Sequence, residues 1–122
     1  MGKLYVIGIG PGGLDEMTLR AVKAIEESDI IVGYTKYIEM VKDLIKDKEI
    51  FKTGMRGEEE RCREALELSK DKKVALISTG DSGIYGMAGL ILEMRKDENV
   101  EIIPGITASS AAGSVLGAPL MH

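Results

Sequence analysis

The chain has 122 residues, of which 44% are hydrophobic and 30% are charged, and its formal net charge is −4. This length allows one domain and is too short for two of typical size. The acidic balance argues against a general nucleic-acid or membrane surface, and the apolar stretches are too short to span a membrane. The one cysteine, Cys62, cannot form an internal disulfide and fits a reducing cytoplasm.

Short apolar runs alternate with segments of helical periodicity along the chain. The apolar runs predict strands over residues 4–9, 29–32, 49–52, 73–78 and 100–103. The segments between and after them predict helices over 16–27, 36–46, 58–70, 85–95 and 107–116. Strands that alternate with helices in this way predict an α/β fold with an open, mainly parallel five-stranded sheet flanked by helices.

Two of the predicted helices have boundaries that can be tested against a structure. In the first, Asp15 is the expected N-cap, and Leu19, Val22 and Ile25 are the expected inward-facing residues. The second is expected over 36–46, because Ile38, Val41, Leu44 and Ile45 recur at helical spacing.

Two glycine-containing loops follow two successive predicted strands, at 79–86 and at 104–110. Loops that leave the carboxyl ends of strands in an open α/β sheet build its ligand crevice, so these loops predict a small-molecule site. A structural explanation stays open for both: small residues also allow close packing, and Asp81 is a possible helix cap. Capping and ligand contact are compatible, because free N–H groups at a helix start also bind anions.

Residues 8–13 match the dinucleotide-binding pattern G-x-G-x-x-G between a strand and a helix. That fingerprint requires an acidic residue at the far end of the second strand, whereas Asp29 lies at the near end and Tyr34 follows the far end. Pro11 also removes a backbone N–H from the loop. The pattern is therefore more typical of a tight strand-to-helix turn than of NAD binding.

Other kinds of catalysis have little support in the sequence. Ser82 lies in a glycine-rich loop, but a serine nucleophile needs an adjacent base, and the one histidine, His122, is the last residue. The sequence contains no Cys/His cluster of the kind that binds zinc, so no metal site is predicted. Met87 and Met94 are more typical of a core than of a cofactor site.

Three segments, at 6–21, 80–86 and 103–112, together resemble the tetrapyrrole (corrin and porphyrin) methyltransferase family. The resemblance covers the whole chain but only the N-terminal half of a family member. It implies an N-terminal α/β domain over 1–116 and, over 117–122, the start of a linker to a second domain. A domain of this kind is expected to be inactive without its second half.

The segments at 33–38 and 53–56 are most similar to the branch that methylates C17 of precorrin-3B or of cobalt-precorrin-3 (cobalt-factor III). The resemblance implies methylation from S-adenosylmethionine, with ring contraction, in cobalamin biosynthesis. Three alternatives stay open: another tetrapyrrole methylase, a family sibling such as a diphthine synthase or ribosomal-RNA methylase, and a nucleotide-binding module without methyl transfer. The resemblance also implies a cytoplasmic homodimer without a nucleic-acid or membrane partner.

The resemblance assigns contact residues position by position. The implied S-adenosylmethionine contacts are Pro11, Thr79, Gly80, Asp81, Ile84, Thr107 and Ala108. Tyr34, Lys36 and Arg56 are candidates for binding the anionic tetrapyrrole, and ordinary surface roles are an open alternative for them. Uroporphyrinogen-methylating relatives have an acidic residue where this chain has Tyr34, and the lysine expected near Gly54 is absent. Their acid/base roles therefore do not transfer, and the catalytic residues are unknown.

Overall fold

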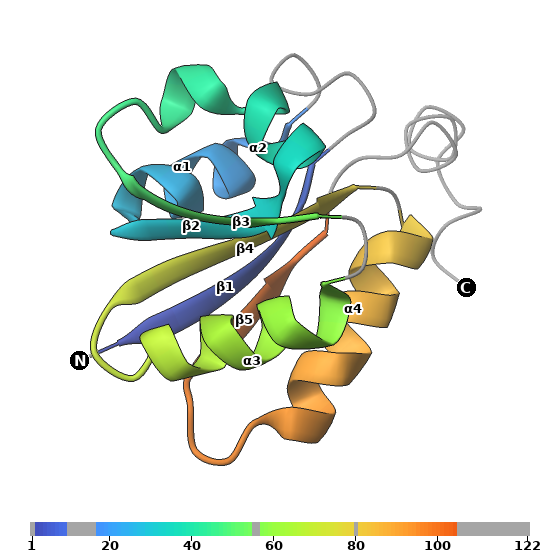
Figure 1. Cartoon of the computed structure of the whole chain (residues 1–122). Coiled ribbons are helices and arrows are strands. Elements are labelled where there is room, and N and C mark those ends of the chain that lie inside the picture. Colours follow the sequence, from blue (N-terminus) through green and yellow to red (C-terminus); the bar gives the residue numbers. More distant parts are fainter. Residues whose placement is uncertain (1, 10–16, 55–56, 80, 105–122) are drawn as a thin grey trace.

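The computed structural model describes residues 2–9, 17–54, 57–79 and 81–104, which form a parallel sheet covered by helices on both faces (Figure 1). The strands are β1 (Lys3–Ile9), β2 (Ile30–Tyr34), β3 (Glu49–Thr53), β4 (Lys73–Thr79) and β5 (Val100–Ile103). The helices are α1 (Leu19–Glu27), α2 (Thr35–Met40), the 3₁₀ helix η2 (Lys42–Leu44), α3 (Glu58–Leu68) and α4 (Asp81–Met94). The predicted α/β fold is confirmed.

The five strands lie in the order β3-β2-β4-β1-β5 and all pair in parallel. The register pairs Ile9 at the end of β1 with Thr79 at the end of β4, and Tyr34 at the end of β2 with Thr53 at the end of β3. The strands therefore end at the same side of the sheet, which we call the carboxyl edge. The opposite side, where the strands begin, is the amino edge.

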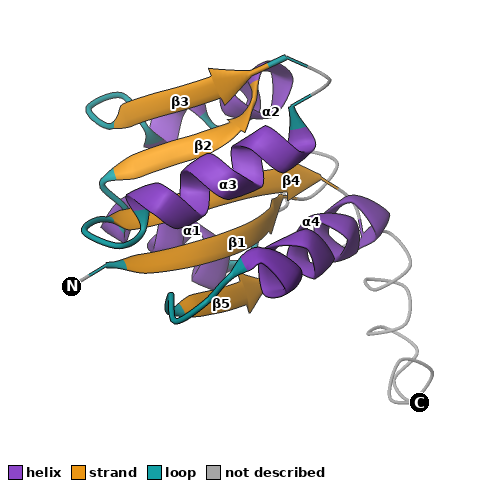
Figure 2. Ribbon diagram, turned by 60° about the horizontal axis from the view of Figure 1, so that its bottom comes forward, coloured by secondary structure: helices purple, strands orange, loops and turns teal. Residues whose placement is uncertain are grey.

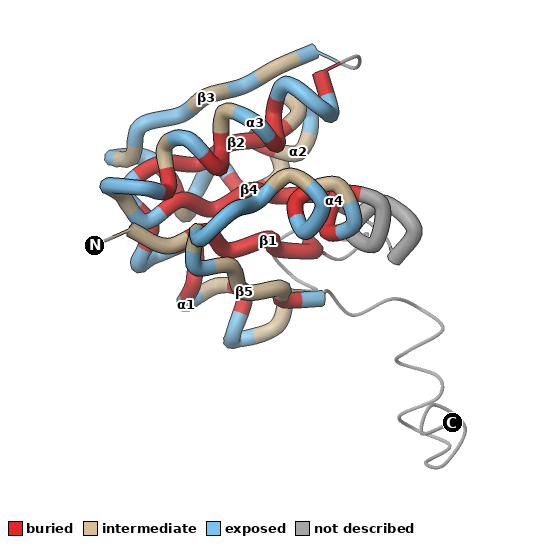
Figure 3. The backbone as a smooth tube through the Cα atoms, turned by 90° about the horizontal axis from the view of Figure 1, so that it is seen from below, coloured by how far each residue is buried: buried red, intermediate tan, exposed pale blue. Residues whose placement is uncertain are grey.

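The helices form two layers, with α1 and α2 on one face of the sheet and α3 and α4 on the other (Figures 1 and 2). Along β1, Tyr5, Ile7 and Ile9 join the core under the α1/α2 layer, while Leu4 and Val6 join the core under the α3/α4 layer. A strand covered on both faces needs apolar residues at every position, which explains the continuous apolar runs in the sequence. Figure 3 shows this burial along β1 and β4 at the centre of the sheet.

Helix α1 begins later than predicted. Thr18, not Asp15, is the N-cap residue, and its Oγ1 accepts a hydrogen bond from the Ala21 backbone N–H at 3.0 Å. Leu19, expected to face inward, is 89% exposed, whereas Ile25 is fully buried. The expectation was wrong because steps of three residues each rotate the helix face by about 60°, so Leu19 and Ile25 lie about 120° apart.

The helix predicted over 36–46 is also interrupted. Helix α2 ends at Met40, and Val41 has φ −115° and ψ 16°, outside the helical region. A short 3₁₀ turn follows, yet Val41 and Ile45 are both buried as expected. Isolated helices of this length are marginal, so packing against the sheet decides where the helix stops.

Helix α4 begins at Asp81, four residues before the predicted start at Tyr85. Glycines at 83 and 86 favoured a loop in the sequence, but they lie inside the helix, whose Met87 and Ile91 are buried in the core. The helix predicted over 107–116 lies outside the described residues. In the part of the chain that the structure describes, no helix is long and apolar enough to cross a membrane.

Candidate functional site

The helices that follow the neighbouring strands β1 and β4 lie on opposite faces of the sheet. Ile9 of β1 and Thr79 of β4 are register partners, but α1 after β1 and α4 after β4 belong to different layers. In open α/β sheets such a divergence leaves a ligand crevice outside the strand ends. We therefore take the carboxyl ends of β1 and β4 as the candidate cofactor site.

Three of the predicted cofactor contacts lie at this position in the backbone. Thr79 is the last residue of β4, Asp81 is the first residue of α4, and Ile84 lies in its first turn. The other four predicted contacts, Pro11, Gly80, Thr107 and Ala108, lie outside the described residues. The described backbone thus brings the end of β4 and the start of α4 together beside the end of β1.

The predicted substrate contacts lie further along the same edge, where β2 passes into α2. Tyr34 ends β2 and is half-buried, and its ring meets that of Tyr37 edge-on, with centroids 5.2 Å apart and an interplanar angle of 86°. Lys36 is exposed in the first turn of α2. Arg56 lies outside the described residues.

A buried arginine behind this turn was not predicted from the sequence. Arg61, in the first turns of α3, is only 4% exposed. Its Nη1 donates to Thr53 Oγ1 at 2.5 Å and to the Gly54 carbonyl at 3.0 Å. The sequence does contain a pattern that indicates its burial. Arg61 stands four residues before Ala65, an inward residue of the same helix, and this spacing places the two on one face.

The cysteine has no catalytic features. Cys62 is fully buried, with its Sγ 3.2 Å from Met87 Sδ between α3 and α4. Burial raises the pKa of this thiol to about 11, which suppresses the reactive thiolate. Among the described residues, no three His, Cys, Asp or Glu side chains are grouped to hold a metal ion.

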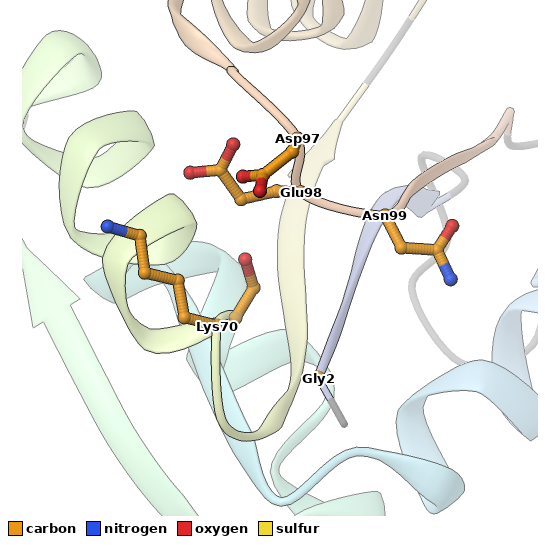
Figure 4. Close-up of a pocket in the computed structure, with 6 residues that line it drawn as sticks. Gly2, Lys70, Asp97, Glu98 and Asn99 are labelled. Atoms are coloured by element: carbon orange, nitrogen blue, oxygen red, sulfur yellow. The ribbon is translucent and has the colours of Figure 1, made fainter.

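A hollow of about 570 Å³ lies at the other end of the sheet (Figure 4). It is lined by Gly2, Ser69, Lys70, Asp97, Glu98 and Asn99. Across it, Lys70, in the turn after α3, faces Asp97 and Glu98, so its walls carry charges of both signs. It lies at the amino edge, whereas ligand crevices of parallel α/β sheets lie at the carboxyl ends, so the carboxyl edge is the better candidate site.

Known proteins match the chain over nearly its whole length. It is 54% identical to the "Probable cobalt-factor III C(17)-methyltransferase" of Salmonella typhimurium, over 98% of this chain and 52% of that protein. It is 47% identical to the "Cobalt-factor III methyltransferase" of Priestia megaterium, over 99% of this chain and 24% of that protein. Among solved structures, the methyltransferase CobJ superposes with a TM-score of 0.79 at 33% identity, covering all of this chain and 54% of CobJ.

The chain therefore spans about half the length, or less, of these proteins. The sequence profile of one family, described as Tetrapyrrole (Corrin/Porphyrin) Methylases, matches residues 3–122. This match extends from the first strand through the last residue, and the fold agrees with that of CobJ. The chain belongs to the tetrapyrrole (corrin/porphyrin) methylase family.

Proposed function

We propose that the complete protein methylates C17 of cobalt-factor III, or of the related cobalt-precorrin-3 or precorrin-3B, in cobalamin biosynthesis. The methylation accompanies contraction of the macrocycle, and this chain forms the N-terminal half of the enzyme. The observation that carries the proposal is the 54% identity, along 98% of the chain, to the Salmonella protein of that name. We expect the complete protein to be a cytoplasmic homodimer and the isolated chain to be inactive, since it spans 52% of that relative.

The proposed methyl donor is S-adenosylmethionine, held at the carboxyl ends of β1 and β4. Its sulfonium supplies an electrophilic methyl group when bound. The proposed contacts are Pro11, Thr79, Gly80, Asp81, Ile84, Thr107 and Ala108. The described part of this set fits a polar cofactor, because the first turn of α4 has backbone N–H groups without intrahelical partners. The role of the chain is then to hold and orient the donor.

The tetrapyrrole is proposed to bind beside the donor, toward β2 and β3. Its carboxylates would meet Lys36 and Arg56, and Tyr34 would contact the macrocycle. The exposed position of Lys36 in the first turn of α2 supports this proposal. Orientation of two bound reactants accounts for about 7–11 kcal/mol of barrier lowering in well-aligned reactions, so the proposal requires no nucleophilic side chain.

The test is methyl transfer by the complete protein from labelled S-adenosylmethionine. Each candidate substrate is offered separately: cobalt-factor III, precorrin-3B, other precorrins, uroporphyrinogen, and the substrates of diphthine synthases and ribosomal-RNA methylases. We expect the labelled methyl group to be transferred to C17 of cobalt-factor III or precorrin-3B. Label on a different substrate would reassign the enzyme within its family. Binding of NAD with none of S-adenosylmethionine would overturn the cofactor proposal.

The cofactor position is tested by Asp81→Ala. Loss of a charged hydrogen-bonding group is expected to weaken S-adenosylmethionine binding by roughly tenfold or more, measured by calorimetry on the complete protein. The control is Asp97→Ala, at the amino-edge hollow, which should leave the affinity unchanged. Unchanged affinity in a folded Asp81→Ala protein contradicts the assignment of this loop.

A further inference from the structure

Arg61 is a buried cation at the start of α3. The ion pairs among side chains that the structure describes do not include Arg61, and its two acceptors there, Thr53 Oγ1 and the Gly54 carbonyl, are neutral. Within the described part of the chain, its Nε also has no hydrogen-bond partner. Burial of a charge and of an unpaired N–H both cost free energy. A contribution to folding stability therefore does not by itself explain why an arginine occupies this buried position.

Thr53, the last residue of β3, is contacted from two sides. Arg61 Nη1 binds the Thr53 hydroxyl from α3. On the other side, Thr35, the first residue of α2, donates its hydroxyl to the Thr53 carbonyl at 3.2 Å. Tyr34 is the register partner of Thr53 in the sheet. Thr53 thus connects α3 to the turn between β2 and α2.

The start of α3 lies directly against the same threonine. A Cβ atom on Gly57, the N-cap residue of α3, would come within 2.9 Å of both Thr53 Cβ and Thr53 Oγ1. The Gly57 carbonyl in turn accepts a hydrogen bond from the Arg61 backbone N–H at 2.6 Å. A displacement of the Arg61 backbone would therefore move Gly57, which lies close against Thr53.

We propose that Arg61 is a positioning residue for substrate binding. Its guanidinium fixes the side chain of Thr53, and Thr53 fixes the β2–α2 turn, so that Tyr34 and Lys36 stay in place at the carboxyl edge. Arg61 itself does not touch the substrate. This inference rests on the proposed function in one respect, which is that Tyr34 and Lys36 contact the tetrapyrrole.

The kinetic test uses the complete protein and four variants: Arg61→Lys, Arg61→Met, Thr53→Ser and Thr53→Val. Arg61→Met and Thr53→Val should raise KM for the tetrapyrrole roughly fivefold, as for one lost hydrogen bond. The KM for S-adenosylmethionine should change by less than about twofold, because the donor site is separate. Thr53→Ser keeps the hydroxyl and should behave as wild type. Arg61→Lys keeps a cationic donor on a shorter side chain and should therefore raise KM less than Arg61→Met does.

A double variant tests whether the two residues act together. Arg61→Met combined with Thr53→Val should raise KM no more than either change alone, because both remove the same contact. A KM increase equal to the product of the two single effects would overturn the proposal. Ile91→Val, a small core deletion in the same layer, controls for general destabilisation and should leave KM unchanged.

A second measurement does not depend on enzyme activity. Hydrogen exchange of the backbone amides over residues 34–38, followed by mass spectrometry, should become roughly fivefold faster in Arg61→Met and Thr53→Val, the factor for one hydrogen bond. Arg63→Met is the matched control, because Arg63 is exposed on the same helix and pairs with Glu59. Unchanged exchange in folded Arg61→Met and Thr53→Val proteins overturns the positioning role. If exchange over residues 34–38 becomes faster in these variants but the complete protein methylates no tetrapyrrole, the positioning role of Arg61 stands and only the proposed function is contradicted.

Discussion

The two helical layers both pack apolar side chains against the sheet but differ in where their polar contacts lie. In the α1/α2 layer, polar contacts fix both ends of α1. Thr18 caps its start. At its end, Lys48 Nζ donates to the Glu26 carbonyl at 2.8 Å and to the Ser28 carbonyl at 2.7 Å. In the α3/α4 layer, Arg61 makes its polar contacts with Thr53 and Gly54, at the ends of α3 and β3 nearest the candidate site. The buried apolar side chains of this layer are Cys62, Ala65, Leu66, Met87 and Ile91.

Position along the sheet explains the difference. Lys48 precedes β3 and Ser28 precedes β2, so the contacts at the end of α1 lie at the amino edge, away from the candidate site. Lys3, at the start of β1, and Glu101, near the start of β5, form an ion pair near the same edge. The start of α4, Arg61 and the start of α2 lie at the opposite, carboxyl edge. Changes at the amino edge should therefore alter stability and leave ligand binding intact.

The largest expected effect comes from matched core deletions in the two layers. Ile91→Ala in α4 and Ile25→Ala in α1 each remove a fully buried side chain, and each should lower the free energy of unfolding by about 2–5 kcal/mol. Burial raises the pKa of Cys62 to about 11, so we expect slow alkylation in the wild type, and only Ile91→Ala should speed it. Urea unfolding of the complete protein and mass spectrometry of iodoacetamide labelling measure the two effects.

Cys62→Ser identifies the labelled peptide and is the control for other cysteines. If Ile25→Ala accelerates labelling of Cys62 as much as Ile91→Ala does, the two layers open together. The distinction between them would then not extend to their dynamics.

The strands followed from the sequence because of the way this sheet is buried. With helices on both faces, the central strands become continuous apolar runs, and β5, at the edge of the sheet, has the predicted bounds of 100 and 103. The order of the strands did not follow, since β1 pairs with β4 rather than with β2. That pairing depends on how the crossing helices pack, which local patterns do not encode.

Helix ends and the candidate site were predicted less well, for local reasons. Asp15 and Thr18 are both good capping residues, and only the packing of Ala21 and Ile25 selects Thr18. The crevice was predicted from the loops that follow the strands, while its contact residues came from family resemblance. The burial of Arg61 does not follow from its residue type, because arginine is mostly exposed, although its spacing to Ala65 places it on the inward face of α3.

A smaller effect is expected from Lys48→Met at the amino edge. The variant keeps the aliphatic stem but loses the two hydrogen bonds and the positive charge at the carboxyl end of α1. The free energy of unfolding should fall by about 1 kcal/mol, measured by urea unfolding, with KM values unchanged. Lys46→Met, an exposed neighbour, is the matched control. Equal effects of the two variants would show that Lys48 does not cap α1, and a changed KM would break the separation between the two edges.

The smallest effect is expected from acid, through Glu101. Its hydrogen bond with Lys3, at 2.8 Å, and its contact with Arg20 hold the pKa of this carboxyl below its ordinary value of 4.5. Because the unfolded chain binds the proton more readily, the stabilisation is complete above about pH 4.5 and is lost as the pH falls through the lower folded value.

The groups are partly exposed, so Glu101→Gln should cost only a few tenths of a kcal/mol at neutral pH, and less in high salt. The difference in unfolding temperature between wild type and Glu101→Gln should therefore close on acidification. A difference that persists well below the ordinary pKa would mean that Glu101 acts through its packing. A difference that is large at neutral pH would mean that the ion pair at the amino edge stabilises the sheet as strongly as the apolar contacts of α3 and α4 do.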